Sequence, residues 1–153
     1  MAGKVARGTM LWQSALSDVY SYDIQHSDTI GALKIVEAMV LQYPQVANFY
    51  NFSGYFNLKK GNYSQAAFYY RKLYMMNKDT ILPAIIIKSY LQANNPQQAL
   101  AFEQYNSPSN QQATVTVLNQ IISNEAQLKQ KPGDKALIQQ ISNDYKVFGI
   151  NRE

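Results

Sequence analysis

Residues 47–80 read ANFYNFSGYFNLKKGNYSQAAFYYRKLYMMNKDT and decide the fold. Apolar residues recur at helical spacing on both sides of Gly61-Asn62, a dipeptide typical of turns. The pattern predicts two short helices, at about 46–60 and 63–77, that fold back on each other. Gly54 in the first helix and Ala66 in the second are small enough to let the two helices approach closely.

The pattern of this hairpin recurs in weaker form along the chain. Its expected buried face carries Ala66, Tyr70 and Leu73, in the order small, large, large. The same order of sizes stands 34 residues earlier, at Ala32, Val36 and Met39. After the hairpin, residues 94–99 (NNPQQA) again combine a turn with a small residue. The sequence therefore predicts repeated helical hairpins.

Helical periodicity also extends beyond the central hairpin. Further helices are expected at about 11–22, 29–42, 82–93, 96–105, 111–129 and 135–148. Breaks at Tyr43-Pro44, at Ser107-Pro108 and at 131–134 (KPGD) separate several of them, because a residue that precedes proline disfavours the helical conformation. No segment has a convincing strand pattern, so the expected fold class is all-α.

The period, the small residues and the turns together resemble the tetratricopeptide-repeat (TPR) family. The likeness covers about residues 13–106, with one good repeat at 47–80, a degenerate one before it and a weak one after it. It implies antiparallel helix-turn-helix repeats, about three in number, stacked as a TPR-like α-solenoid with C-terminal capping helices. We therefore expect a flexible tail or tag remnant at 1–10, a repeat domain at 11–130 and a C-terminal capping helix at 131–153.

The composition of the 153-residue chain allows one domain with a sizeable core. Charged residues make up 16%, below the roughly 25% of typical soluble domains, and there are 12 tyrosines. Either the source genome is biased, or part of the surface serves a partner, since tyrosine is enriched at interface cores. The absence of cysteine excludes disulfides and thiolate metal ligands.

No apolar run reaches the roughly 20 residues that a membrane helix needs. The longest such run, residues 81–87 (ILPAIII), ends at Lys88. The N-terminal MAGKVARGTM carries two positive charges without an apolar region behind them, so no signal peptide is predicted. We expect a cytoplasmic protein with no membrane span.

The acid and base inventory predicts that the protein is not an enzyme. The single histidine, His26, lies in a polar turn beside Asp23 and Asp28. A loop histidine near acids is far more often a solvated group than a metal ligand or a general base. No glycine-rich phosphate loop precedes a helix, and the acidic residues are scattered. No cofactor and no metal are expected.

Positive charge is concentrated between residues 59 and 88. This segment holds one acid, Asp79, and six basic residues: Lys59, Lys60, Arg71, Lys72, Lys78 and Lys88. They could form a patch for an acidic protein partner or for nucleic acid, and the first is favoured because the neighbouring tyrosines belong to the expected core. The alternative is a solvated outer face of the helices.

In TPR arrays the first helix of each pair lines a concave groove in which partners bind. The resemblance implies these groove residues: Asn48, Asn51, Tyr55, Leu58, Lys59, Ile81, Ala84, Lys88 and Leu91. Their apolar stripe and amide-rich rim suit an apolar or amphipathic segment of a protein or peptide partner. Ala84 and Ile85 stand where repeats that clamp carboxylates need polar groups, so no such clamp is expected. Alternatively, the C-terminal helices fill the groove themselves.

Two functions compete on this basis. In size and layout the chain resembles the small TPR-like chaperones of bacterial type III secretion, which hold needle or translocator subunits before export. This resemblance implies a non-enzymatic chaperone that holds an apolar or helical segment of its partner. The alternative is a scaffold or adaptor subunit of a larger assembly. The sequence leaves the identity of the partner and the oligomeric state open.

Overall fold

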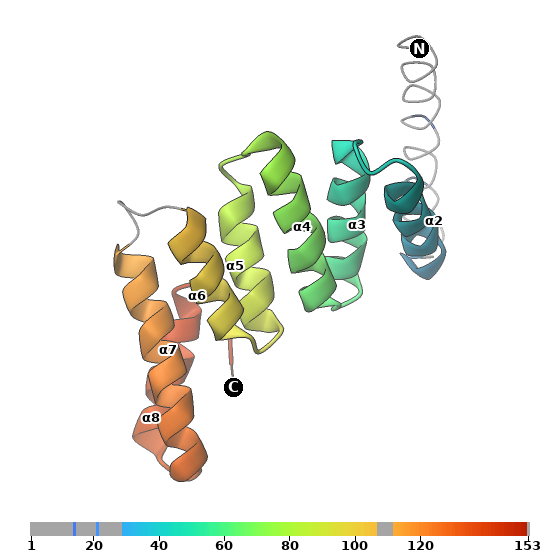
Figure 1. Cartoon of the computed structure of the whole chain (residues 1–153). Coiled ribbons are helices and arrows are strands. Elements are labelled where there is room, and N and C mark those ends of the chain that lie inside the picture. Colours follow the sequence, from blue (N-terminus) through green and yellow to red (C-terminus); the bar gives the residue numbers. More distant parts are fainter. Residues whose placement is uncertain (1–13, 15–20, 22–28, 107–111, 153) are drawn as a thin grey trace. The chain divides into compact units, whose positions relative to one another are not determined.

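The structure is a computed structural model that describes residues 14, 21, 29–106 and 112–152 (Figure 1). Within these residues the chain forms seven α-helices and no strand, which confirms the all-α class. The helices are α2 (Thr29–Gln42), α3 (Ala47–Lys59), α4 (Tyr63–Asn77), α5 (Leu82–Gln92), α6 (Pro96–Asn106), α7 (Gln112–Gln130) and α8 (Lys135–Lys146). The predicted tail at 1–10, most of the helix predicted at 11–22 and the turn around His26 lie outside the described residues.

The predicted helix ends agree closely with the observed ones. α2 and α4 begin and end where the sequence placed them, α5 and α6 differ by one residue at the C-terminal end, and α3 and α7 differ by one residue at each end. α8 ends at Lys146, whereas the periodicity predicted a helix to residue 148. The chain turns just after this point, at Gly149.

The chain divides into two compact units, Met1–Lys78 and Asp79–Glu153. The boundary falls at Lys78, which ends α4 in the left-handed conformation with φ of 54°. The sequence predicts a C-terminal capping helix within residues 131–153. In the structure α7 and α8, on either side of residue 131, pack against each other within the second unit.

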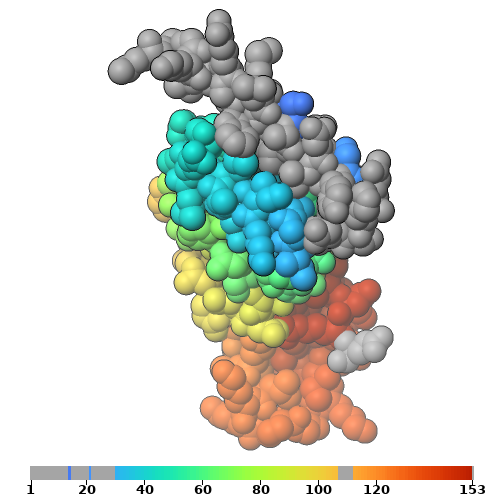
Figure 2. Space-filling view, turned by 90° about the vertical axis from the view of Figure 1, so that its right-hand side faces the viewer, coloured from blue at the N-terminus to red at the C-terminus, as the bar shows by residue number. Residues whose placement is uncertain are grey.

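In the first unit α3 and α4 form an antiparallel hairpin, and α2 packs on α3 (Figure 1). The space-filling view shows α2 and α3 as adjacent parts of the surface (Figure 2). The two helices of the hairpin pack closely at Gly54, which has no side chain. A Cβ added there would lie only 2.8 Å from the ring of Tyr70. Ala66 and Ala67 are fully buried on α4, as small residues at a close helix crossing must be.

In the second unit α5 pairs with α6, α6 with α7, and α7 with α8 (Figure 1). Its apolar core is drawn from all four helices and from the segment after α8. Its large members are Leu82, Ile86, Ile87, Tyr90, Leu91, Phe102, Leu118, Ile121, Ile141, Tyr145 and Ile150. Asp134 caps α8, since its carboxylate accepts hydrogen bonds from two backbone N–H groups of the first turn, at 3.0 and 3.2 Å.

One kind of helix ending recurs after α3, α5 and α8. Gly61, Asn94 and Gly149 adopt left-handed φ values of 76°, 55° and 66°. After α3, the N–H of Gly61 donates to the carbonyl of Leu58 and that of Asn62 to the carbonyl of Asn57. The same two hydrogen bonds form at the other two turns, where the donors are the N–H groups of Asn94 and Gly149 and of the residue after each. These two hydrogen bonds together form the Schellman motif, which reverses the chain and satisfies carbonyl groups of the last helical turn.

Candidate functional site

The predicted groove residues fall on both compact units, with five on α3 in the first. Asn48, Asn51 and Lys59 are exposed, and Tyr55 and Leu58 are half-buried. Their spacing of three and four residues places them on one face of α3. The Nζ atom of Lys59 lies 5.7 Å from the centroid of the Tyr55 ring, which is within the range of a cation–π contact.

The other four predicted residues lie on or just before α5. Ile81 precedes the helix and is 67% exposed, Ala84 is exposed, and Lys88 is half-buried. Leu91, by contrast, has no exposed surface. It belongs to the core of the second unit, so a partner cannot reach it in this structure. Leu91 lies one helical turn after Lys88, but the sequence could not show that the side chain of Leu91 is buried by the packing of its own unit.

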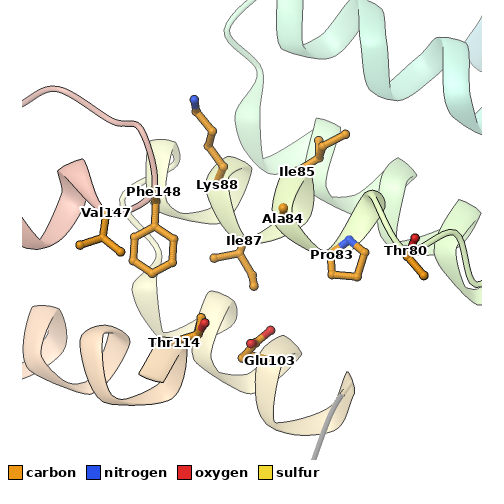
Figure 3. A pocket seen from close by; sticks show the side chains of 10 residues that line it. All are labelled: Thr80, Pro83, Ala84, Ile85, Ile87, Lys88, Glu103, Thr114, Val147 and Phe148. Carbon is orange, nitrogen blue, oxygen red and sulfur yellow. The ribbon is translucent and has the colours of Figure 1, made fainter. Parts of the chain in front are cut away.

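A cavity of about 580 Å³ lies against α5 in the second unit (Figure 3). Ala84 and Lys88 are the two predicted groove residues that line it. The complete lining is Thr80, Pro83, Ala84, Ile85, Ile87, Lys88, Glu103, Thr114, Val147 and Phe148. Most of these side chains present carbon to the cavity, and Ala84 remains exposed beside it. The cavity therefore offers a largely apolar surface that solvent can reach.

The segment after α8 forms one wall of this cavity. Val147 and Phe148, which lie between the end of α8 at Lys146 and the left-handed turn at Gly149, line the cavity (Figure 3). The Nζ atom of Lys88 donates a hydrogen bond of 3.0 Å to the carbonyl oxygen of Gly149. The sequence left open whether C-terminal residues fill the groove, and in this unit they line the cavity without closing it.

Arg152 holds this C-terminal segment in place. Its guanidinium group lies 3.1 Å from a carboxylate oxygen of Glu125 on α7 and also donates to the side-chain oxygen of Asn94 after α5. It stacks on the Tyr145 ring, with 3.6 Å between the guanidinium carbon and the ring centroid. The hydroxyl of Tyr145 donates to the same Glu125 oxygen at 2.8 Å. These contacts fix the wall to α7, to α8 and to the turn after α5.

Glu103 on α6 is the buried acid of the lining. It is only 2% exposed, and burial raises the pKa of its carboxyl group above the ordinary value of 4.5. The predicted groove residues did not include the lining residues that lie outside α5 and its approach, which are Glu103, Thr114, Val147 and Phe148, nor Thr80, Pro83, Ile85 and Ile87. A glycine that follows an amphipathic helix by a few residues is a C-cap signal, so Gly149 could have indicated the turn at the end of α8.

The predicted basic patch is not one surface within a single unit. Lys59, Lys60, Arg71, Lys72 and Lys78 belong to the first unit and are exposed. Asp79 and Lys88 belong to the second. Three of the lysines contact aromatic rings of their own helix or its end, at 4.9 to 5.7 Å from the ring centroids: Lys59 with Tyr55, Lys72 with Phe68 and Lys78 with Tyr74.

Three comparisons with known proteins found no match to the chain. No protein-family model matches it, and neither a curated protein nor a solved structure gives a significant match. Within the described ranges, no cluster of three or more His, Cys, Asp or Glu side chains is arranged to hold a metal ion. None of the described helices combines the length and the apolar content needed to cross a membrane.

Proposed function

We propose that the chain is a non-enzymatic, cytoplasmic protein-binding module that holds an apolar or amphipathic segment of a partner, as a small chaperone does. The observation that carries this proposal is the apolar cavity beside α5. Its volume of about 580 Å³ lies within the roughly 300–1,000 Å³ typical of binding sites. Its carbon-rich lining suits the apolar side chains of a peptide rather than a charged substrate.

Local packing supports a TPR-like arrangement of the helical hairpins. The close contact between Gly54 and Tyr70 and the buried Ala66 are what such a hairpin requires at its crossing. The turns after α3 and α5 use the same hydrogen-bond pattern, around Gly61 and Asn94. Repeated hairpins of this kind support the proposed likeness to the small TPR-like chaperones of type III secretion.

An affinity purification from the native cell, with mass spectrometry, tests this proposal. The wild-type chain is compared with Ala84→Arg, which places a long charged side chain beside the cavity. Ala101→Arg is the matched control, because Ala101 is an exposed alanine on α6 that does not line the cavity. We expect Ala84→Arg to lose a partner that the wild type and Ala101→Arg both retain. Identical sets of partners for all three proteins would contradict the proposal.

The same purification distinguishes a chaperone from a scaffold subunit. A chaperone is expected to self-associate or to be unstable alone, and to become monodisperse when its client is co-expressed. A scaffold subunit is expected to be stable alone and to copurify with several members of an assembly at fixed ratios. Size-exclusion chromatography with light scattering, with and without the recovered partner, provides the readout.

A further inference from the structure

The outward side of α4 combines apolar and basic side chains. Phe68, Met75 and Met76 are 49%, 52% and 43% exposed, and Arg71 and Lys72 between them are exposed as well. Spacings of three, four, seven and eight residues place these five on one side of the helix. We call these five residues the α4 outer face. The opposite side of α4 is buried in the hairpin through Ala66, Tyr70 and Leu73.

Three large apolar side chains grouped on one helix face are more informative than scattered ones, since contiguous apolar surface marks interaction sites. Methionine is unbranched and polarizable, and it adapts to varied partner surfaces. The Nζ atom of Lys72 lies 5.7 Å from the centroid of the Phe68 ring, so the cation and the apolar group are presented together. This arrangement suits a partner that offers both apolar contact and negative charge.

Residues 29–78, the continuous described part of the first unit, are strongly asymmetric in charge. They include six basic residues: Lys34, Lys59, Lys60, Arg71, Lys72 and Lys78. The one acid in this range, Glu37, is already engaged, because its carboxylate accepts hydrogen bonds from Tyr69 at 3.3 Å and from Asn57 at 3.4 Å. An excess of one sign attracts and orients partners of the opposite sign.

We propose that the α4 outer face binds an acidic, amphipathic helical segment of a partner protein. The apolar side chains of the segment would pack on Phe68, Met75 and Met76, and its carboxylates would pair with Arg71 and Lys72. Nucleic acid fits less well, since its phosphates match the charge but offer no aliphatic side chains to cover the two methionines. The inference rests on the proposed role as a protein-binding module and adds a second surface, separate from the α5 cavity.

Fluorescence anisotropy with the full chain tests this inference. The probe is a labelled synthetic helical peptide with a leucine stripe flanked by glutamates. A peptide of the same composition in scrambled order serves as the probe control. We expect micromolar binding of the helical peptide and at least about tenfold weaker binding by Arg71→Glu/Lys72→Glu, a loss of about 1.4 kcal/mol. Lys129→Glu/Lys131→Glu makes the same charge change at exposed positions of the second unit and should bind like the wild type.

Phe68→Ser separates apolar contact from charge. We expect it to weaken peptide binding at least about fivefold, with an unchanged melting temperature, because the side chain is half exposed. A clear fall in melting temperature would show that the face is packed within the folded chain and would overturn the inference. If the wild type self-associates and Phe68→Ser does not, the face binds a second copy of the chain, and this result would also overturn the inference.

Three further results would also reject the acidic segment as the occupant: equal binding of the scrambled peptide, equal loss in the lysine control variant, and displacement of the peptide by poly(U) RNA. Ala84→Arg is measured in parallel and should leave peptide binding unchanged. If partner capture depends on Ala84 while the peptide does not bind, this inference fails and the proposed function stands. If peptide binding depends on Arg71 and Lys72 while Ala84→Arg retains all the partners of the wild type, the proposed role of the α5 cavity is contradicted and this inference stands.

Discussion

Replacement of Gly54 by alanine tests the closest approach in the first unit. The added Cβ would lie 2.8 Å from Cε2 and Cζ of Tyr70 and 2.9 Å from its Cδ2. Tyr70 is 5% exposed, so its ring cannot move without displacing neighbours. Overpacking of a core costs about 1–3 kcal/mol, whereas alanine in place of glycine within a helix contributes about 1 kcal/mol. We expect Gly54→Ala to lower the free energy of unfolding by about 1 kcal/mol, within a range of roughly 0–2.

Urea denaturation followed by far-UV circular dichroism measures this change. The decisive comparison is a double-mutant cycle with Tyr70→Leu, which removes the ring that the new methyl group would meet. In that background we expect Gly54→Ala to become neutral or stabilising, which gives a coupling energy of about 1–3 kcal/mol. Gly133→Ala is the control, because an added Cβ there meets no atom within 4 Å.

Helix propensity alone makes the opposite prediction. If Gly54→Ala stabilises the otherwise unchanged chain by about 1 kcal/mol, the two helices do not cross as closely as the structure has them. A coupling energy near zero with Tyr70→Leu would also refute the reasoning, since the cost would then arise elsewhere. Either result would remove the main packing argument for a TPR-like hairpin.

Two further predictions concern the second unit. Asp134→Ala removes the side-chain cap of α8 and should lower the free energy of unfolding by about 1 kcal/mol in urea denaturation, while an unchanged value would contradict the cap. Glu103→Gln should raise the melting temperature at pH 7 and change it little near pH 4. Burial raises the folded-state pKa of Glu103 above its unfolded value, so its contribution to stability is greatest at low pH and is lost as the pH rises through the folded-state pKa. Melting curves at both pH values test this, and an equal shift at each would contradict it.

Local signals predicted most of the helix boundaries. Tyr43-Pro44 ends α2, and Gly61 reverses the chain after α3 because its φ of 76° suits glycine. Phe148 is the instructive failure. Its spacing continues the apolar face of α8, but the helix ends at Lys146, and Phe148 lies just before the left-handed Gly149 and lines the cavity. Periodicity cannot report where a helix stops when the capping signal lies just beyond it.

The candidate site depends on contacts between distant parts of the chain, and these limited its prediction. Ala84 and Lys88, two of the groove residues implied by the TPR resemblance, both lie on α5 and line the cavity. Glu103, Thr114 and Phe148 come from α6, α7 and the segment after α8, and only tertiary packing brings them to α5. Leu91 shows the converse, since a position with groove spacing is covered by the packing of its own unit.

Methyl NMR of the purified chain, with and without its recovered partner, tests the central claim most directly. Ala84, Ile87 and Thr114 carry methyl groups beside the α5 cavity, and Ala101 carries one on α6 away from it. We predict that the partner shifts the first three resonances and leaves that of Ala101 unchanged. If the partner binds while the three cavity resonances stay in place, the cavity is not the binding site and the account of this protein is contradicted.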